Sequence, residues 1–309
     1  MLLAPCGTGF DAPERPGLAN PAYWAPGGLV CLECVWSSNA AVPFDYSWRR
    51  PYTAGSLAGL YWWSGYAVTD NDETAEGLLA RAVERRAQAL SEHDSKRVLA
   101  AYGVPVTREE LVPDVAAAVA AAERIGYPVV VKACSPDLMH KSDQGLVVLN
   151  VADTAAVERA VEAVEQAADG AALDGYLVQQ MVRGRREVIV GGLRDKRFGP
   201  CVMLGLGGVL VEAVADVAFR LAPLDERDAL EMIGEIKAQR LFEAVRGEPA
   251  VDRPALSQLL MAVGRALMDN AGISQVDVNP VIFDGAAPVA VDALVTLTPA
   301  EAAEDSQAP

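Results

Sequence analysis

The sequence predicts a mixed α/β or α+β fold, and three observations support this prediction. Short apolar runs of strand length, such as residues 129–131, alternate with longer segments of helical periodicity. Glycines such as Gly103 and Gly126 stand where helical segments end. The chain has 309 residues, of which 51% are hydrophobic, and this suffices for one large domain or two ordinary ones with a core each.

Composition and charge exclude several classes of protein. The formal net charge is −16, and binding along nucleic-acid phosphates needs a broad basic face, so we expect no nucleic-acid partner. The N-terminus lacks the pattern of a signal peptide, and the most apolar long stretch, residues 54–68, is shorter than the ~20 residues of a spanning helix. We therefore expect a cytoplasmic protein with no membrane partner. Cys31 and Cys34 form a C-x-x-C pair without the second pair that a zinc site requires.

The chain divides into three parts by texture. Residues 1–82 contain all five tryptophans and many prolines and glycines, with little periodicity, so we expect an irregular N-terminal segment of unassigned role. Residues 83–298 carry the regular pattern of one structured domain, and residues 299–309 are expected to form a flexible acidic tail.

The elements follow one another in a regular order. A helical pattern begins near Thr74, and Ser91 is placed to cap a second helix that stops at Gly103. Beyond these we expect an extended segment at 104–106, helices at 114–125, 154–168, 226–238 and 254–270, and strands at 129–131, 145–151, 176–181, 187–193, 201–204, 209–212, 275–282 and 289–294.

The first candidate site surrounds Lys132, which ends the apolar run 129–131. A buried strand does not tolerate a lysine without an anion. A polar loop with His140 and Lys141 follows before Gly145, and lysines together with exposed backbone N–H groups suit the phosphates of a nucleotide. A surface hairpin whose lysine reaches out to water explains the same residues, and the stretch by itself does not decide between the two interpretations.

Two further patterns point to a nucleotide with its metal ion. Gly207 and Gly208 follow the strand at 201–204 and allow a ligand, or a second backbone, to approach closely. Asp277 and Asn279 share one face of a strand, and Asp292 lies in the middle of the next strand, as in a hairpin partner. Such a sparse set of oxygen ligands suits Mg²⁺. The alternative is that these polar groups cap turns.

Six segments together resemble one known family. They are SEHDSKRVLAAYGVPV, GYPVVVKACSPDLMHKSDQG, VQQMVRGRREVIVG, RDKRFGPCVMLGLGG, EMIGEIKAQRLFEAVRG and QVDVNPVIF with VAVDALV. Over residues 83–298 the sequence resembles the ATP-grasp subunit of ADP-forming acetyl-CoA (acyl-CoA) synthetases, which are related to the β subunit of succinyl-CoA synthetase. The resemblance implies an ATP-grasp fold of two subdomains that clamp a nucleotide. It also implies a ligase that converts acyl-CoA, ADP and phosphate reversibly to acid, CoA and ATP through an acyl phosphate and phosphohistidine.

The resemblance also implies residue roles. His140 and Asp277 are the catalytic candidates: His140 relays phosphate or only binds it, and Asp277 orients the phosphohistidine of a partner, with one methylene less reach than the glutamate of the succinyl enzyme. Asn279 and Asp292 are the Mg²⁺ ligands. The residues that bind ATP or ADP are Lys132 at the phosphates, Gln180 and Met181 beside the adenine, and Glu187, Gly207 and Gly208.

The chain lacks parts that the full reaction needs. Only His93 and His140 are histidines, and residues 1–82 show no CoA-binding pattern. We therefore expect an α-type subunit that carries the main phosphohistidine and through which CoA and a small carboxylic acid enter. Leu146 stands where the family usually has a second glycine and is expected to limit the approach of phosphate. The alternatives are the ATP-grasp part of a protein lysine acetyltransferase relative, a non-catalytic nucleotide-binding module, and an orphan whose first 82 residues form an interaction surface.

Overall fold

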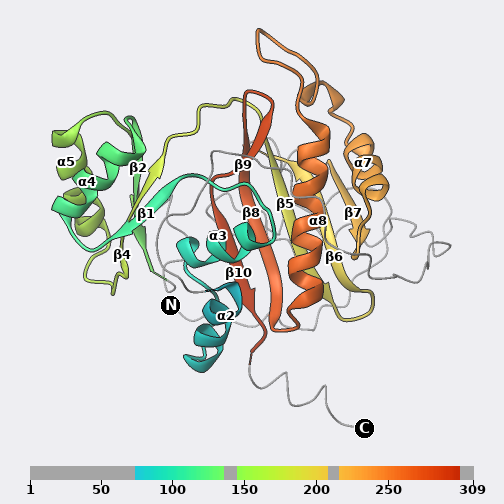
Figure 1. Ribbon diagram of the computed structural model, residues 1–309, viewed down its shortest axis with the longest axis horizontal. Helices are drawn as coiled ribbons and strands as arrows, with labels where there is room; N and C mark the ends of the chain where they lie inside the picture. Colours follow the sequence, from blue (N-terminus) through green and yellow to red (C-terminus); the bar gives the residue numbers. More distant parts are fainter. Residues whose placement is uncertain (1–73, 136–144, 208–215, 300–309) are drawn as a thin grey trace, which may run out of the picture.

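The computed structural model describes residues 74–135, 145–207 and 216–299, and it contains two antiparallel sheets with helices packed on them. Figure 1 shows the smaller sheet beside the larger one, with α4 and α5 at its outer side and α8 lying across the larger sheet. Within the described ranges, no helix is both long and apolar enough to cross a bilayer. The mixed fold expected from the sequence is confirmed.

Two helices precede the sheets. Helix α2 (Ala75–Glu84) is capped by Thr74 and helix α3 (Glu92–Ala101) by Ser91, whose hydroxyl accepts a hydrogen bond from the Asp94 N–H at 3.2 Å. Both helices match the sequence prediction. The boundary expected after residue 82 falls inside α2, which packs its apolar side into the core of the large sheet.

The small sheet has the order β1-β4-β2-β3, and every neighbouring pair is antiparallel. Its strands are β1 (Glu109–Val112), β2 (Val129–Cys134), β3 (Val147–Val151) and β4 (Gly175–Gln180). The helices α4 (Val115–Ile125) and α5 (Thr154–Ala167) cover it, and small alanine side chains let α4 approach closely. The sequence pattern did not predict β1.

Leu146 lies in the core of this small sheet. Its side chain is fully buried, and its carbonyl accepts a hydrogen bond from the Ala133 N–H at 2.9 Å. The side chain therefore fills the space between sheet and helices. Its side chain points into this core, and the expectation that a residue larger than glycine here limits the approach of phosphate stays a prediction.

The large sheet has the order β10-β8-β5-β6-β7, and β9 also pairs with β8. Its strands are β5 (Glu187–Asp195), β6 (Gly199–Leu206), β7 (Val217–Leu221), β8 (Ile273–Asp284), β9 (Ala287–Ala290) and β10 (Ala293–Leu297). Helices α7 (Glu226–Glu235) and α8 (Arg253–Asp269), with the short helix η2 (Gln239–Leu241), belong to the core on one face. The strand expected at 209–212 lies outside the described residues.

The strand predicted at 289–294 is two strands, which corrects the sequence prediction. The chain leaves the ladder at Val291 and Asp292, opposite Pro280 of β8. The Val291 N–H donates to the Pro280 carbonyl at 3.0 Å, but proline has no N–H with which to return a bond to the Val291 carbonyl. The regular ladder therefore stops here, and Asp292 lies at the break instead of mid-strand.

Arg186, just before β5, holds several loops together. Its guanidinium is almost fully buried and donates hydrogen bonds to four backbone carbonyls and one carboxylate, those of Leu241, Glu243, Pro249, Gly285 and Glu248. We predict that Arg186→Ala lowers the free energy of unfolding by about 3 kcal/mol, because it leaves buried acceptors unpaired. Urea denaturation followed by circular dichroism measures this loss.

The matched control is Arg227→Ala, which removes an exposed ion pair to Glu231 on α7. That substitution should leave the unfolding midpoint nearly unchanged, because exposed pairs contribute little. Equal midpoints for the two variants would contradict the structural role of Arg186.

Candidate functional site

Lys132 of β2 joins the small sheet to the large one. Its side chain is 5% exposed, and its ammonium donates to Glu92 Oε1 at 2.6 Å and to the Val291 carbonyl at 3.3 Å. Glu92 opens α3, and Val291 lies in the link between β9 and β10. The Val291 carbonyl receives no hydrogen bond from Pro280, which has no N–H. The break in the large sheet therefore provides an acceptor for a lysine of the small sheet.

A second buried lysine shares the same carboxylate. Lys96 is fully buried and donates to Glu92 Oε1 at 2.8 Å, Glu109 Oε2 at 2.7 Å and Gln179 Oε1 at 2.8 Å. Glu109 Oε1 also lies 3.0 Å from His93 Nδ1. This cluster of ionisable groups therefore links α3, β1 and β4 to Lys132 of β2.

Neighbouring groups of opposite charge favour the ionised forms of both Lys96 and Glu109. Burial by itself lowers the pKa of Lys96, but Glu109, Glu92 and Asp292 raise it overall above its ordinary value. Burial would raise the pKa of Glu109, yet Lys96 and His93 hold it below its usual range. The sequence interpretation missed Glu92 and Lys96; the available signal was a glutamate and a lysine four residues apart, with the lysine three before the buried Leu99.

Asp277 faces the side of the large sheet opposite α8. One row crosses the sheet from Leu294 through Asp277, Gly191 and Met203 to Phe219. Asp277 Oδ1 is enclosed and has no hydrogen-bond partner among the described residues. Burial, with a contribution from Asp292, raises the pKa of Asp277 to about 7. An enclosed acceptor without a donor is the place where a ligand or metal ion can supply one.

Asn279 and Asp292 lie side by side near this carboxylate. The Asn279 N–H donates to the Asp292 carbonyl at 3.2 Å, so backbone pairing brings the two residues together. The described residues contain no cluster of three or more His, Cys, Asp or Glu side chains suited to a metal ion. Two carboxylates and an amide fit Mg²⁺, which keeps several waters and takes further ligands from phosphates, better than a metal ion that needs a full protein cage.

The remaining predicted residues lie where the two sheets are connected. Gln180 ends β4, its side chain accepts from Arg108 Nε at 3.1 Å, and Met181 follows it. Glu187 begins β5, and burial raises its pKa. A Cβ at Gly207 would lie only 2.6 Å from Glu187 Cγ, so a glycine is needed there. His140 and Gly208 lie outside the described residues.

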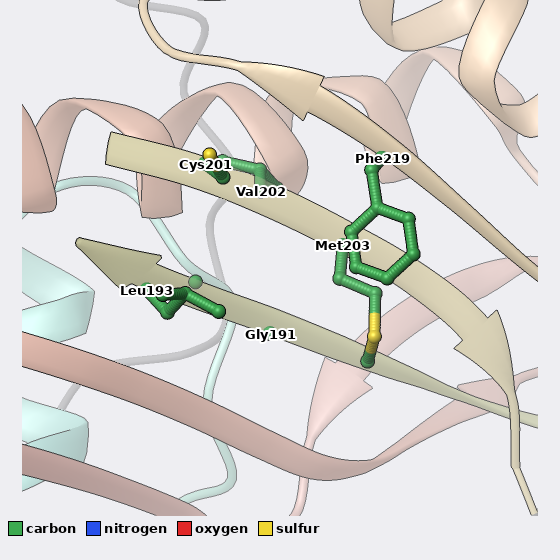
Figure 2. Close-up of a pocket in the computed structure, with 7 residues that line it drawn as sticks. Gly191, Leu193, Cys201, Val202, Met203 and Phe219 are labelled. Carbon is green, nitrogen blue, oxygen red and sulfur yellow. The ribbon is translucent and has the colours of Figure 1, made fainter. Parts of the chain in front are cut away.

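An apolar surface continues from Asp277 along the same face. Ile189 and Met203 form its buried centre, and Figure 2 shows the ring of Phe219 beside Met203. Gly191 and Met203, with Phe219, line a hollow of only about 10 Å³. Cys201 also lines it, but burial raises the pKa of this thiol to about 12, so it stays protonated and is not a nucleophile.

Comparison with known proteins agrees with this architecture. An ATP-grasp domain model matches residues 81–297. The chain is 39% identical over 226 residues to the beta subunit of acetate–CoA ligase [ADP-forming] I of Pyrococcus furiosus, covering 71% of this chain and 97% of that subunit. It is 41% identical over 218 residues to acetate–CoA ligase [ADP-forming] I of Archaeoglobus fulgidus, covering 69% of this chain but only 32% of that protein.

A solved structure has the same fold. An acetyl-coenzyme A synthetase of Candidatus Korarchaeum cryptofilum, in complex with coenzyme A and Ca-AMPCP, matches with a TM-score of 0.70 and 40% identity, covering 73% of this chain and 100% of that one. The chain thus spans about a third of the longer ligase of Archaeoglobus and almost all of a separate beta subunit. From its matched domain and its relatives, the chain belongs to the ATP-grasp family, in the branch that includes the beta subunits of ADP-forming acetate–CoA ligases.

Proposed function

We propose that the chain is the beta-type subunit of a cytoplasmic ADP-forming acyl-CoA synthetase that binds Mg-ADP or Mg-ATP and transfers a phosphoryl group to or from histidine. One observation carries this proposal. A lysine of the small sheet meets the break in the large sheet beside Asp292, on the side where Asn279 lies together with the Asp277 oxygen that has no hydrogen-bond partner in the described part of the chain. A nucleotide's phosphates attract a cationic side chain, and the Mg²⁺ ion that accompanies them takes oxygen ligands; here the two kinds of group come from different subdomains.

The proposed reaction has three balanced steps. Phosphate displaces CoA from acyl-CoA and gives an acyl phosphate. A histidine nitrogen then takes the phosphoryl group and releases the acid, and an oxygen of ADP finally takes it from phosphohistidine, which forms ATP and restores the neutral histidine. The first step belongs to the α-type partner, which would bring CoA, the acid and the main phosphohistidine.

Residues of this chain would supply positioning and charge stabilisation. Lys132 would donate to the phosphates, and Gln180 with Met181 would offer backbone groups to the adenine edge. Asn279 and Asp292 would hold Mg²⁺, which when bound neutralises charge on the phosphates. Asp277 would accept a hydrogen bond from the incoming histidine, because its enclosed oxygen has no partner among the described residues.

The first prediction on nucleotide binding concerns Lys132. Lys132→Met should weaken binding of Mg-ADP about 10- to 100-fold, because a charge-assisted hydrogen bond contributes about 1.5–3 kcal/mol. Isothermal titration calorimetry measures the dissociation constant. The control is Lys237→Met, an exposed lysine after α7, which should bind as the unaltered chain does. Unchanged affinity in Lys132→Met would contradict the phosphate role.

The second prediction concerns Asp292. Asp292→Asn removes a carboxylate ligand, so the Mg²⁺ concentration at half-maximal ADP binding should rise at least about tenfold. Loss of a residue that only supports a metal ligand already lowers metal affinity by about this factor. A Mg²⁺ titration at fixed ADP measures it. Asp284→Asn at the exposed end of β8 makes the same chemical change away from the site and should have no effect. An identical titration for both variants would remove Asp292 from the metal site.

The third prediction concerns His140. Incubation with Mg²⁺ and γ-labelled ATP should place acid-labile phosphate on the chain, and His140→Ala should lose it, because a neutral imidazole nitrogen is nucleophilic at pH 7. His93→Ala is the control; this histidine is buried against Glu109 and should not accept phosphate. Label that persists in His140→Ala would assign the acceptor elsewhere. A chain that binds ATP and takes no label even with an α-type partner would be a binding module only.

A further inference from the structure

The buried pair Glu92 and Lys96 lies directly behind the proposed phosphate lysine. One oxygen, Glu92 Oε1, accepts hydrogen bonds from both Lys132 and Lys96, at 2.6 and 2.8 Å. Both residues project from the start of α3 and are four apart, which puts them on one face of the helix. A carboxylate at this end of a helix is also favoured by the unpaired N–H groups of the first turn.

The sharing of one carboxylate sets the charge that Lys132 can offer to a ligand. A carboxylate that paired with Lys132 alone would cancel most of the attraction of its ammonium for phosphate. Lys96 is fully buried and stays ionised, so it takes up part of the charge of Glu92. Glu109 balances Lys96 from the other side at 2.7 Å.

Geometry also leaves Lys132 with a donor for a ligand. An ammonium group has three N–H bonds. Among the described residues, its acceptors are Glu92 Oε1 and the Val291 carbonyl, which belong to α3 and to the break in the large sheet. These two acceptors fix the direction of the third N–H bond.

We propose that Glu92 and Lys96 are positioning residues that act through Lys132. Glu92 orients the Lys132 ammonium and competes with phosphate for its positive charge. Lys96 weakens this competition, because it neutralises part of the charge of Glu92. The proposal rests on the nucleotide-binding function proposed above and adds a mechanism that tunes phosphate affinity from a buried cluster. Neither residue contacts the ligand in this scheme. They change phosphate affinity only through their charges, so removing the negative Glu92 and removing the positive Lys96 should have opposite effects.

Because Glu92 and Lys96 carry opposite charges, their substitutions should change ADP affinity in opposite directions. Glu92→Gln keeps an acceptor oxygen and removes the competing charge, so it should tighten Mg-ADP binding about 5- to 10-fold. Lys96→Met leaves the full charge of Glu92 on Lys132 and should weaken binding by a similar factor. In the double variant the two changes cancel, and affinity should return close to that of the unaltered chain.

Titration calorimetry with Mg-ADP, and with adenosine as a ligand without phosphates, measures these effects. Adenosine affinity should not change in any variant, because the effect acts on phosphate. Glu123→Gln, an exposed carboxylate on α4, is the matched control for Glu92→Gln. Circular dichroism melting confirms that each variant is folded, and Glu92→Gln decides the question by itself if Lys96→Met does not fold.

Several outcomes would overturn the proposal. A purely structural role predicts weaker or unchanged ADP binding in Glu92→Gln, opposite to the expected gain. Glu92→Gln should also have no effect in a Lys132→Met background, and a gain that persists there would mean that the carboxylate acts on the nucleotide directly. ADP binding that depends on Lys132 but not on Glu92 would refute this inference alone. An unaltered chain that binds no ADP would refute the proposed function as well.

Discussion

The contact of Lys132 with both Glu92 and the Val291 carbonyl is the interaction on which the arrangement of the site depends. It joins the small sheet, the start of α3 and the break in the large sheet through a single buried ammonium. Such a group is stable in an apolar interior only if its charge and its N–H bonds are compensated. The compensation comes from α3 and from the break in the large sheet, whereas the lysine belongs to the small sheet, so the position of the charge also fixes how the two sheets meet.

Pro280 is the backbone counterpart of this ionic contact. Because proline cannot donate, the ladder between β8 and the C-terminal strands is interrupted at Val291 and Asp292. The interruption has two effects at one place: it frees a carbonyl for Lys132 and turns Asp292 out of a regular strand beside Asn279. A break in pairing thus creates the acceptors of the site, as is common for irregular strand positions near functional groups.

The sequence predicted most elements because their signals are local. The cap Ser91 and the helical patterns that begin near Thr74 and at Asp114 placed three helices to within a residue or two. The site residues Lys132, Asp277 and Asn279 could be named because a polar residue inside an apolar strand needs a partner. The single strand expected at 289–294 was wrong, because the break in it depends on pairing with β8, which no local pattern reveals.

The sequence by itself therefore determined the class of fold, the order of its elements and the chemical types in the site, because periodicity, capping and burial preferences act within a few residues. Only the tertiary structure decided which charges meet. Glu92 and Lys96 looked like an ordinary helix start, but Glu92 accepts hydrogen bonds both from Lys96 on its own helix and from Lys132 of β2 in the small sheet. Ion pairs of this kind depend on distances that no local pattern encodes, since they form only after the sheets have packed.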